Sequence, residues 1–206
     1  MKLYLSSIGI PDPDKLAELI GKPLAGLSVA LIPNAKDYFV DRARNFVVAN
    51  RIALFESLGM KVSIVDLRDY KDGAPLKGAL SHFDLIWAMG GNTFMLRYQM
   101  RRAGFDAIIQ GLLEAGVIYG GDSAGALVAG SSIGGINLET SDEPAFADEV
   151  VEDGLKLVPY VIVPHTDNPE FAEVMESVDA RTDQEQIIRL RDDQAVVFTN
   201  GDHQIV

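Results

Sequence analysis

The sequence predicts an α/β fold, a three-layer sandwich with a mainly parallel sheet covered by helices on both faces. Short apolar, β-branched runs alternate with longer segments of helical spacing up to about residue 130. Alternation of this kind builds right-handed βαβ units. Hydrophobic residues make up 48% of the 206 residues, enough for the core that such a sheet requires. The length suits a single domain, which we place at residues 1–206.

Apolar runs bounded by turn residues mark the expected strands. In the first part of the chain they cover residues 2–8, 26–33, 61–65, 84–89 and 117–119. Residues 131–153 are rich in Ser, Gly and acidic side chains and are expected to form loops and short strands. Further strands are predicted within residues 155–163, at 195–199 and at 203–206, the last two around a Gly201–Asp202 turn.

Helices are predicted where apolar residues recur at helical spacing between these runs. A short one opens at Asp12-Pro13 and ends at Gly21, and the longest runs from Asp37 as N-cap to Gly59 just past its end. The other expected helices cover residues 93–100, 105–115 and 169–178.

Composition excludes several classes of function. A net charge of −12 argues against a nucleic-acid partner and against anionic membrane surfaces, both of which require a basic footprint. The chain has no cysteine, so it has no disulfide, no thiolate nucleophile and no thiolate zinc site. Its three scattered histidines offer no metal-ligand spacing, so neither metal nor cofactor is expected. Without a signal-like or membrane-spanning run, we expect a soluble cytoplasmic protein.

The most informative stretch is Gly121-Asp122-Ser123-Ala124-Gly125, which follows an apolar strand and precedes a small-residue helix. This pattern is typical of a nucleophile elbow, a sharp strand-to-helix turn that holds a serine hydroxyl above the end of a sheet. The glycines leave room for the tight turn, and the helix N-terminus would stabilise an oxyanion. The alternative interpretation is a plain βα loop in which Ser123 caps the helix.

His165 is the best candidate for a base that activates Ser123. It follows the apolar run Tyr160–Pro164, so it stands at a strand end, where parallel α/β sheets carry their sites. The alternative is a structural histidine at that strand end, while His82 and His203 are expected to be structural or exposed. A triad also needs an acid. The candidates between Ser123 and His165 are Glu139, Asp142, Glu143, Asp148 and Glu149, with Glu139 and Asp142 best placed.

A second glycine-rich loop, Gly90-Gly91-Asn92-Thr93, follows another predicted strand. Two glycines allow a backbone to approach a ligand closely, and their N–H groups can bind an anion. Together with the N–H of Ala124 this loop could complete an oxyanion hole. The alternative, a helix N-cap at Asn92 or Thr93, can coexist with that role.

Three motifs in this order resemble the peptidase E family of serine peptidases. They are Gly90-Gly91-Asn92-Thr93-Phe94, Gly120-Gly121-Asp122-Ser123-Ala124-Gly125-Ala126 and Val163-Pro164-His165, and the resemblance spans about residues 25 to 200. It implies a flavodoxin-like sandwich related to class I glutamine amidotransferases. It also implies a metal-independent hydrolase, such as the family's aspartyl dipeptidases and cyanophycinases.

The resemblance implies roles for individual residues. Ser123 matches the nucleophile and His165 the general base, while Gly91 and Ala124 match the donors of the oxyanion hole. Gly90, Asn92 and Thr93 match residues beside the substrate, and Glu139 is the nearest fit to the triad acid, with Asp142 still open.

The sequence also departs from the family's dipeptidases. Asp122 stands where they often have tryptophan, just before the nucleophile. Arg181, in the segment 181–186, is the closest match to the arginine that reads the substrate aspartate, although its spacing from His165 is longer. These differences leave the acyl-transfer groups in place and put the preference for aspartate in question.

The sequence therefore predicts a serine peptidase that cleaves short peptides, with N-terminal aspartate favoured. One rival is an α/β-hydrolase esterase, for which the 83 residues after Ser123 are few. The other is a non-catalytic homologue that binds a small ligand. A small peptide is the expected partner, and a homodimer is carried as a hypothesis because small α/β domains often dimerise.

Overall fold

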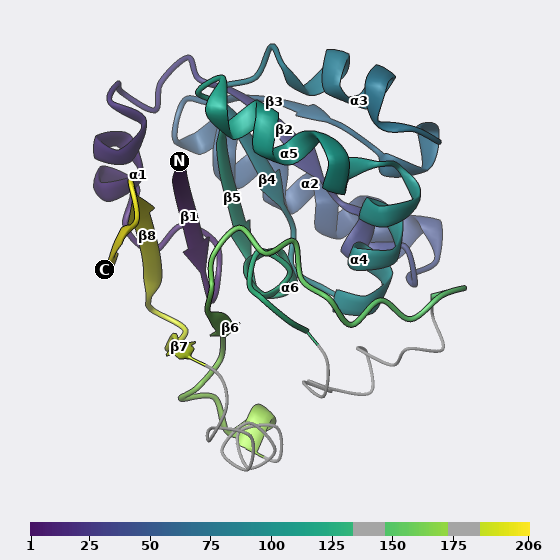
Figure 1. The fold of residues 1–206 in the computed structure, drawn as a ribbon. Coiled ribbons are helices and arrows are strands. Elements are labelled where there is room, and N and C mark those ends of the chain that lie inside the picture. Colours follow the sequence, from purple (N-terminus) through teal and green to yellow (C-terminus); the bar gives the residue numbers. More distant parts are fainter. Residues whose placement is uncertain (134–146, 173–185) are drawn as a thin grey trace.

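The computed structural model describes residues 1–133, 147–172 and 186–206. Within these ranges most strands belong to one sheet (Figure 1). They are β1 (Lys2–Ser6), β2 (Ser28–Ile32), β3 (Lys61–Ile64), β4 (Leu85–Ala88), β5 (Ile118–Asp122), β8 (Ala195–Thr199) and β9 (Asp202–Ile205). The order across this seven-stranded sheet is β3-β2-β4-β5-β1-β8-β9. The first five strands of the chain are parallel, and β8 and β9 add an antiparallel edge.

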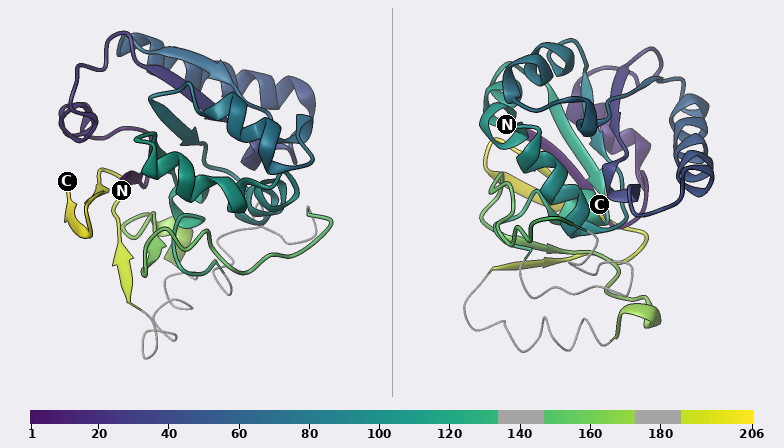
Figure 2. Two further views of the ribbon diagram at one scale, coloured as in Figure 1. Left: turned by 45° about the horizontal axis from the view of Figure 1, so that its top comes forward. Right: turned by 90° about the vertical axis from the view of Figure 1, so that its right-hand side faces the viewer.

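Helices cover both faces of the sheet, which confirms the predicted three-layer α/β fold (Figure 2). The described helices are α1 (Pro13–Ile20), α2 (Asp41–Ser57), α3 (Gly73–Leu80), α4 (Thr93–Arg102), α5 (Phe105–Glu114) and α6 (Ala124–Leu127). Buried residues of α1 and α2 share one hydrophobic core with one face of the strands, and those of α3 to α6 share the other core. Alternation along β1 shows the division, since Leu3 and Leu5 belong to one core and Tyr4 to the other.

The long helix begins later than the sequence predicts. The chain after β2 first forms the 3₁₀ turn η1 (Asn34–Lys36), and α2 starts at Asp41 after the extended Val40. Asp37 does not cap it, because Asn34 Nδ2 and Arg44 Nε hold its carboxylate at 2.8 and 2.9 Å. The predicted end is correct, and Gly59 takes a left-handed conformation with φ of 81°.

The C-terminal third also differs from the expectation. β6 (Val161–Val163) pairs in parallel with β7 (Ile187–Arg189), a strand that the sequence reading missed, in a separate two-stranded sheet. Pro169–Phe171 forms a 3₁₀ turn, η5, where an α-helix over 169–178 was predicted, and residues 173–178 lie outside the described ranges. The final hairpin turns at Asn200–Gly201, one residue earlier than predicted.

The carboxyl ends of neighbouring strands meet at one edge of the sheet. Registers pair Ser6 of β1 with Asp122 of β5, and Ala88 of β4 with Gly121. β6 and β7 lie below this edge in Figure 1. Residues that directly follow β1, β4, β5, β6 and β7 are thereby brought together. Among the described residues no helix has both the length and the apolar character needed to span a bilayer.

Candidate active site

Ser123 occupies the sharp turn between β5 and α6. Its backbone has φ of 50° and ψ of −114°, a strained conformation for a residue with a side chain. The flanking glycines are sterically required: a Cβ on Gly121 would lie 2.6 Å from the Gly125 carbonyl carbon, and one on Gly125 only 2.0 Å from the Ala88 oxygen. The turn thus has the shape that the motif predicts for a nucleophile elbow.

The hydroxyl of Ser123 points to His165 instead of capping α6. Ser123 Oγ lies 3.0 Å from His165 Nε2, and its side chain makes no capping bond to the helix. His165 is 7% exposed, follows β6, and has a positive φ of 62°. Its ring stacks on Phe171 with centroids 4.5 Å apart and planes 14° apart. The structure therefore brings the two predicted residues into hydrogen-bonding contact.

The other ring nitrogen of His165 contacts a carboxylate that sequence reasoning missed. His165 Nδ1 lies 2.6 Å from Asp192 Oδ1. Asp192 comes three residues after the end of β7, which pairs with the strand that leads to His165. Asp192 lies beyond His165 in the sequence, whereas the predicted acids all lie between Ser123 and His165. Glu139 and Asp142 lie in residues 134–146, outside the described ranges.

Three further polar groups hold Asp192. The buried hydroxyl of Ser7 donates to Asp192 Oδ1 at 2.9 Å and accepts the backbone N–H of His165 at 2.8 Å. Asn168 Nδ2 donates to the second oxygen at 3.2 Å, and the Asp192 N–H donates to the Asp167 carboxylate. Partial burial would raise the pKa of Asp192, but the hydrogen bonds from His165, Ser7 and Asn168 lower it below its usual value. The carboxylate stays ionised beside the imidazole.

The loop after β4 lies directly against the serine. A Cβ on Gly90 would sit 2.9 Å from Ser123 Cβ, and Gly91 has φ of 145° with Ala35 O at 2.4 Å from its ideal Cβ position. Only glycine fits such close approaches. Among the described residues no hydrogen bond engages the N–H of Gly91, and Ala124, the first residue of α6, has no intrahelical acceptor for its own. Gly91 follows the glycine that approaches Ser123, and Ala124 follows Ser123 itself, while the role of their N–H groups as oxyanion donors stays a prediction.

Asn92 and Thr93 have a structural role in this loop. Asn92 is fully buried, its Oδ1 accepts the N–H of Met95 at 2.7 Å, and its own N–H donates to Ala35 O at 2.8 Å. The predicted N-cap is therefore at Asn92, and Thr93 is 2% exposed at the start of α4. A contact of either residue with substrate stays a prediction, as does that of Arg181, which lies outside the described ranges.

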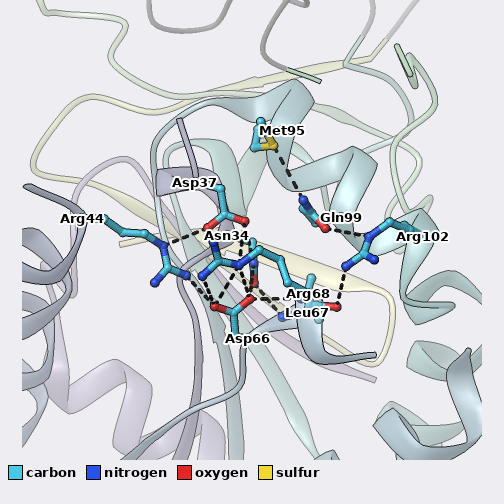
Figure 3. Close-up of polar contacts among 9 residues, drawn as sticks. All are labelled: Asn34, Asp37, Arg44, Asp66, Leu67, Arg68, Met95, Gln99 and Arg102. Carbon is cyan, nitrogen blue, oxygen red and sulfur yellow. Dashed lines mark hydrogen bonds and ion pairs between the residues drawn. The ribbon is translucent and has the colours of Figure 1, made fainter. Parts of the chain in front are cut away.

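A buried charge network supports the segment that carries Ala35 (Figure 3). Asn34 Nδ2 donates to Asp37 and Asp66, each at 2.8 Å, while Arg44 bridges the same two carboxylates at 2.9 and 2.8 Å. Burial raises the pKa of Asp37 more than its cationic neighbours lower it. Burial acts in the same direction on Asp66, but hydrogen bonds from Arg68 and Asn34 outweigh it and hold the pKa of Asp66 well below its usual range.

The remaining histidines lie away from Ser123. His82 is exposed ahead of β4, and His203 is exposed on β9, where its ring contacts Tyr160 and Phe198. Their predicted structural or surface placement is consistent with these positions.

Comparison with known proteins assigns the chain to a family. The model of Peptidase family S51 matches residues 12–206. This chain belongs to Peptidase family S51. The resemblance to peptidase E is thereby confirmed, and with it a serine-type peptidase. The match begins earlier and ends later than residues 25–200, the span of the resemblance predicted from the motifs.

Relatives that match most of the length of this chain support the assignment. An uncharacterized peptidase of Listeria monocytogenes, Lmo0363, is 34% identical over 156 residues, 75% of this chain and 73% of that protein. Peptidase E of Escherichia coli is 32% identical over 170 residues, 81% of this chain and 69% of that protein. A crystal structure from Listeria monocytogenes, ascribed to a peptidase E protein, has a TM-score of 0.83 at 28% identity and covers 100% of this chain and 97% of its own.

Proposed function

We propose that this chain hydrolyses short peptides through an acyl-enzyme, with Ser123, His165 and Asp192 as its catalytic triad. The observation that carries the proposal is the hydrogen-bonded series from Ser123 Oγ to His165 Nε2, at 3.0 Å, and from His165 Nδ1 to Asp192 Oδ1, at 2.6 Å. Nucleophile, base and orienting acid in contact at one sheet edge are the arrangement that acyl transfer requires. Asp192 takes the role that the sequence reading gave to Glu139.

Each step of the proposed reaction is assigned to a group of this chain. Ser123 Oγ attacks the peptide carbonyl while His165 takes its proton at Nε2 and then passes it to the leaving amine. Asp192 keeps the Nδ1 proton in position and stabilises the imidazolium. The N–H groups of Gly91 and Ala124 stabilise the oxyanion, and a water activated by His165 then cleaves the acyl-enzyme.

For the substrate, we propose dipeptides and short peptides with an N-terminal aspartate. The support is the likeness to Escherichia coli peptidase E, together with the matching glycine and serine motifs. Arg181 is proposed to bind the substrate carboxylate, since a fixed guanidinium pairs with a carboxylate in a bidentate manner.

The test is hydrolysis of dipeptides and chromogenic amides that begin with Asp, Asn, Glu or Ala, by the wild-type chain and by Ser123→Ala. We expect Asp-selective cleavage, and a loss in the variant of at least about 10³-fold. Ser81→Ala is the matched control and should keep full activity, because Ser81 is exposed and its hydroxyl bonds only the Gly78 carbonyl among the described residues.

Other outcomes would change the proposal at defined points. Cleavage that depends on Ser123 without selectivity for Asp would keep the triad and reject the substrate. Full activity in Ser123→Ala would reject the mechanism. If no peptide is cleaved and Ser123 does not react with a fluorophosphonate, the chain is a non-catalytic binding homologue.

A further inference from the structure

The residue immediately before Ser123 is a buried carboxylate with two fixed donors. Asp122 is 4% exposed; Trp87 Nε1 donates to its Oδ1 at 2.8 Å, and Arg51 Nη2 donates to its Oδ2 at 2.8 Å. The Arg51 side chain is itself only 16% exposed. Little water is therefore available to screen either charge, and each depends on the other for compensation.

This carboxylate lies against the proposed oxyanion hole. A Cβ on Gly90 would meet Asp122 Oδ2 at 3.0 Å and Ser123 Cβ at 2.9 Å, so both side chains border the same point of the loop. The peptide unit that begins at Gly90 carries the N–H of Gly91. The carboxylate thus borders Gly90, the residue before Gly91, and belongs to the residue two positions before Ala124, so it lies close to the segments that carry both proposed donors.

A fixed negative charge at this place opposes the proposed reaction. Negative charge develops on the substrate oxygen in the transition state, and a nearby carboxylate repels it strongly where water is scarce. A carboxylate paired with a guanidinium has no net charge and leaves the oxyanion donors effective. Arg51 is the residue that supplies this compensation.

Arg51 also connects the elbow to the loop after β1. Gly9, with φ of 55°, approaches Arg51 so closely that a Cβ on it would lie 3.1 Å from Nη1. That loop begins with Ser7, which bonds His165 and Asp192. The guanidinium of Arg51 therefore lies between the loop after β1, which carries Ser7, and the elbow, which carries Ser123.

We propose that Arg51 and Trp87 are positioning residues that neutralise and fix Asp122, and that this compensation is required for oxyanion stabilisation at Ser123. The proposal rests on the proposed acyl transfer and deepens it. In this chain the position before the nucleophile holds a carboxylate that is neutralised by Arg51 of α2. The dipeptidases that the chain resembles often have an uncharged tryptophan at that position.

The experiment compares Arg51→Met, Asp122→Asn and the double variant with the wild-type chain. The readouts are the rate of Ser123 phosphonylation by a fluorophosphonate, and kcat and KM on the best substrate of the panel. We expect Arg51→Met to lower kcat and the phosphonylation rate by about 10- to 100-fold, with KM changed far less. The double variant, which also lacks the carboxylate, should have a kcat and a phosphonylation rate within about threefold of those of Asp122→Asn alone.

The rescue separates charge compensation from packing. If Arg51 only filled space, the double variant would be as impaired as Arg51→Met or more so, and that result would overturn the proposal. An Arg51→Met chain within twofold of wild type would overturn it too. Arg101→Met, which removes an exposed arginine paired with Glu149, is the matched control and should behave as wild type.

Misfolding of a variant and failure of the proposed function can each be told apart from failure of this inference. If circular dichroism shows that Arg51→Met does not fold, Arg51→Lys and Arg51→Gln are compared instead. The proposal then requires Arg51→Lys to have at least about tenfold more activity than Arg51→Gln. If wild-type Ser123 does not react with the fluorophosphonate, the proposed function fails and this inference with it. If the wild-type chain reacts and every Arg51 variant reacts equally fast, only this inference fails.

Discussion

In the proposed triad Asp192 orients the imidazole of His165, and its charge is the property that an amide cannot replace. We expect Asp192→Asn to lower kcat by on the order of 10²–10⁴-fold, because an asparagine side chain can hold the wrong tautomer and cannot stabilise the imidazolium. KM should change little, since Asp192 contacts the base and not the substrate. Steady-state kinetics on the peptide panel measure both quantities.

The neighbouring residue gives a matched control for that substitution. Asp193 is exposed and pairs with Arg191, so Asp193→Asn should leave kcat unchanged. If Asp192→Asn kept activity within twofold of wild type, the acid of the triad would have to be sought in residues 134–146, which contain Glu139 and Asp142.

Two of the three residues of the proposed triad could be predicted because each follows a recognisable strand. Ser123 ends a β-branched run within a glycine pattern, and His165 follows an apolar run that ends in proline. Asp192 follows β7, which has three residues and includes Arg189, so its sequence carries almost no strand signal. Only its pairing with β6 makes it a strand and carries Asp192 to His165.

At the scale of elements, η1 links the buried charge network to the glycine loop beside Ser123. Asn34 is fully buried; its Oδ1 accepts the N–H of Leu67 at 3.0 Å and its Nδ2 holds two carboxylates. The carbonyl oxygen of the next residue, Ala35, accepts the hydrogen bond of the Asn92 N–H and lies against Gly91. The position of Gly91, a proposed oxyanion donor, therefore depends on how firmly η1 is held.

We expect Asn34→Ala to lower the free energy of unfolding by about 1–3 kcal/mol, because it leaves the buried N–H of Leu67 without its acceptor and removes one hydrogen bond from each of the carboxylates of Asp37 and Asp66. It should also lower kcat, since the Ala35 carbonyl loses its fixed position. Urea unfolding and kinetics on the same preparation measure both effects. Asn50→Ala, at an exposed position of α2, is the control, and equal stability of the two variants would contradict this account.

The same network explains why the start of α2 was predicted wrongly. Asp37 is the kind of residue that caps helices, and the apolar spacing beyond it continues the helical pattern. Its carboxylate instead accepts hydrogen bonds from Asn34, which lies before it, and from Arg44, which lies within the helix. The network is completed by Asp66 and Arg68, which come after α2 and β3 in the chain, and such distant pairing has no local signature. The caps at Asp12 and Asn92 need only neighbours along the chain; the first was predicted, and the second was one of two predicted alternatives.

For the whole molecule, the buried carboxylates set how stability changes with acid. The folded chain holds the pKa of Asp66 below its usual value, so its contribution is complete above the unfolded-state pKa near 4 and is lost as pH falls through the folded-state pKa. The raised pKa of Asp37 acts in the opposite direction and offsets part of this loss, because protonation relieves a buried charge.

We therefore expect Asp66→Asn to be destabilised by about 2 kcal/mol at pH 7, with the difference from wild type shrinking as the pH is lowered towards 3. Urea unfolding at a series of pH values measures this. Asp69→Asn, exposed in the adjoining turn η2 (Leu67–Asp69), is the control and should follow the wild-type curve. A gap for Asp66→Asn that stays constant from pH 7 to 3 would show that its charge does not contribute.

The position of β1 inside the sheet has a consequence for biosynthesis. β1 lies between β5 and β8, and Ser7 at its end contacts Asp192, which is 185 residues later in the chain. A nascent chain that has already exposed Ser123 and His165 still lacks the group that orients the histidine and the strand that covers one side of β1. Since translation proceeds at about 5–20 residues per second, the growing chain spends seconds in this incomplete state. The peptidase should therefore stay inert towards its own emerging sequence and its neighbours on the ribosome until the segment containing Asp192 has been made.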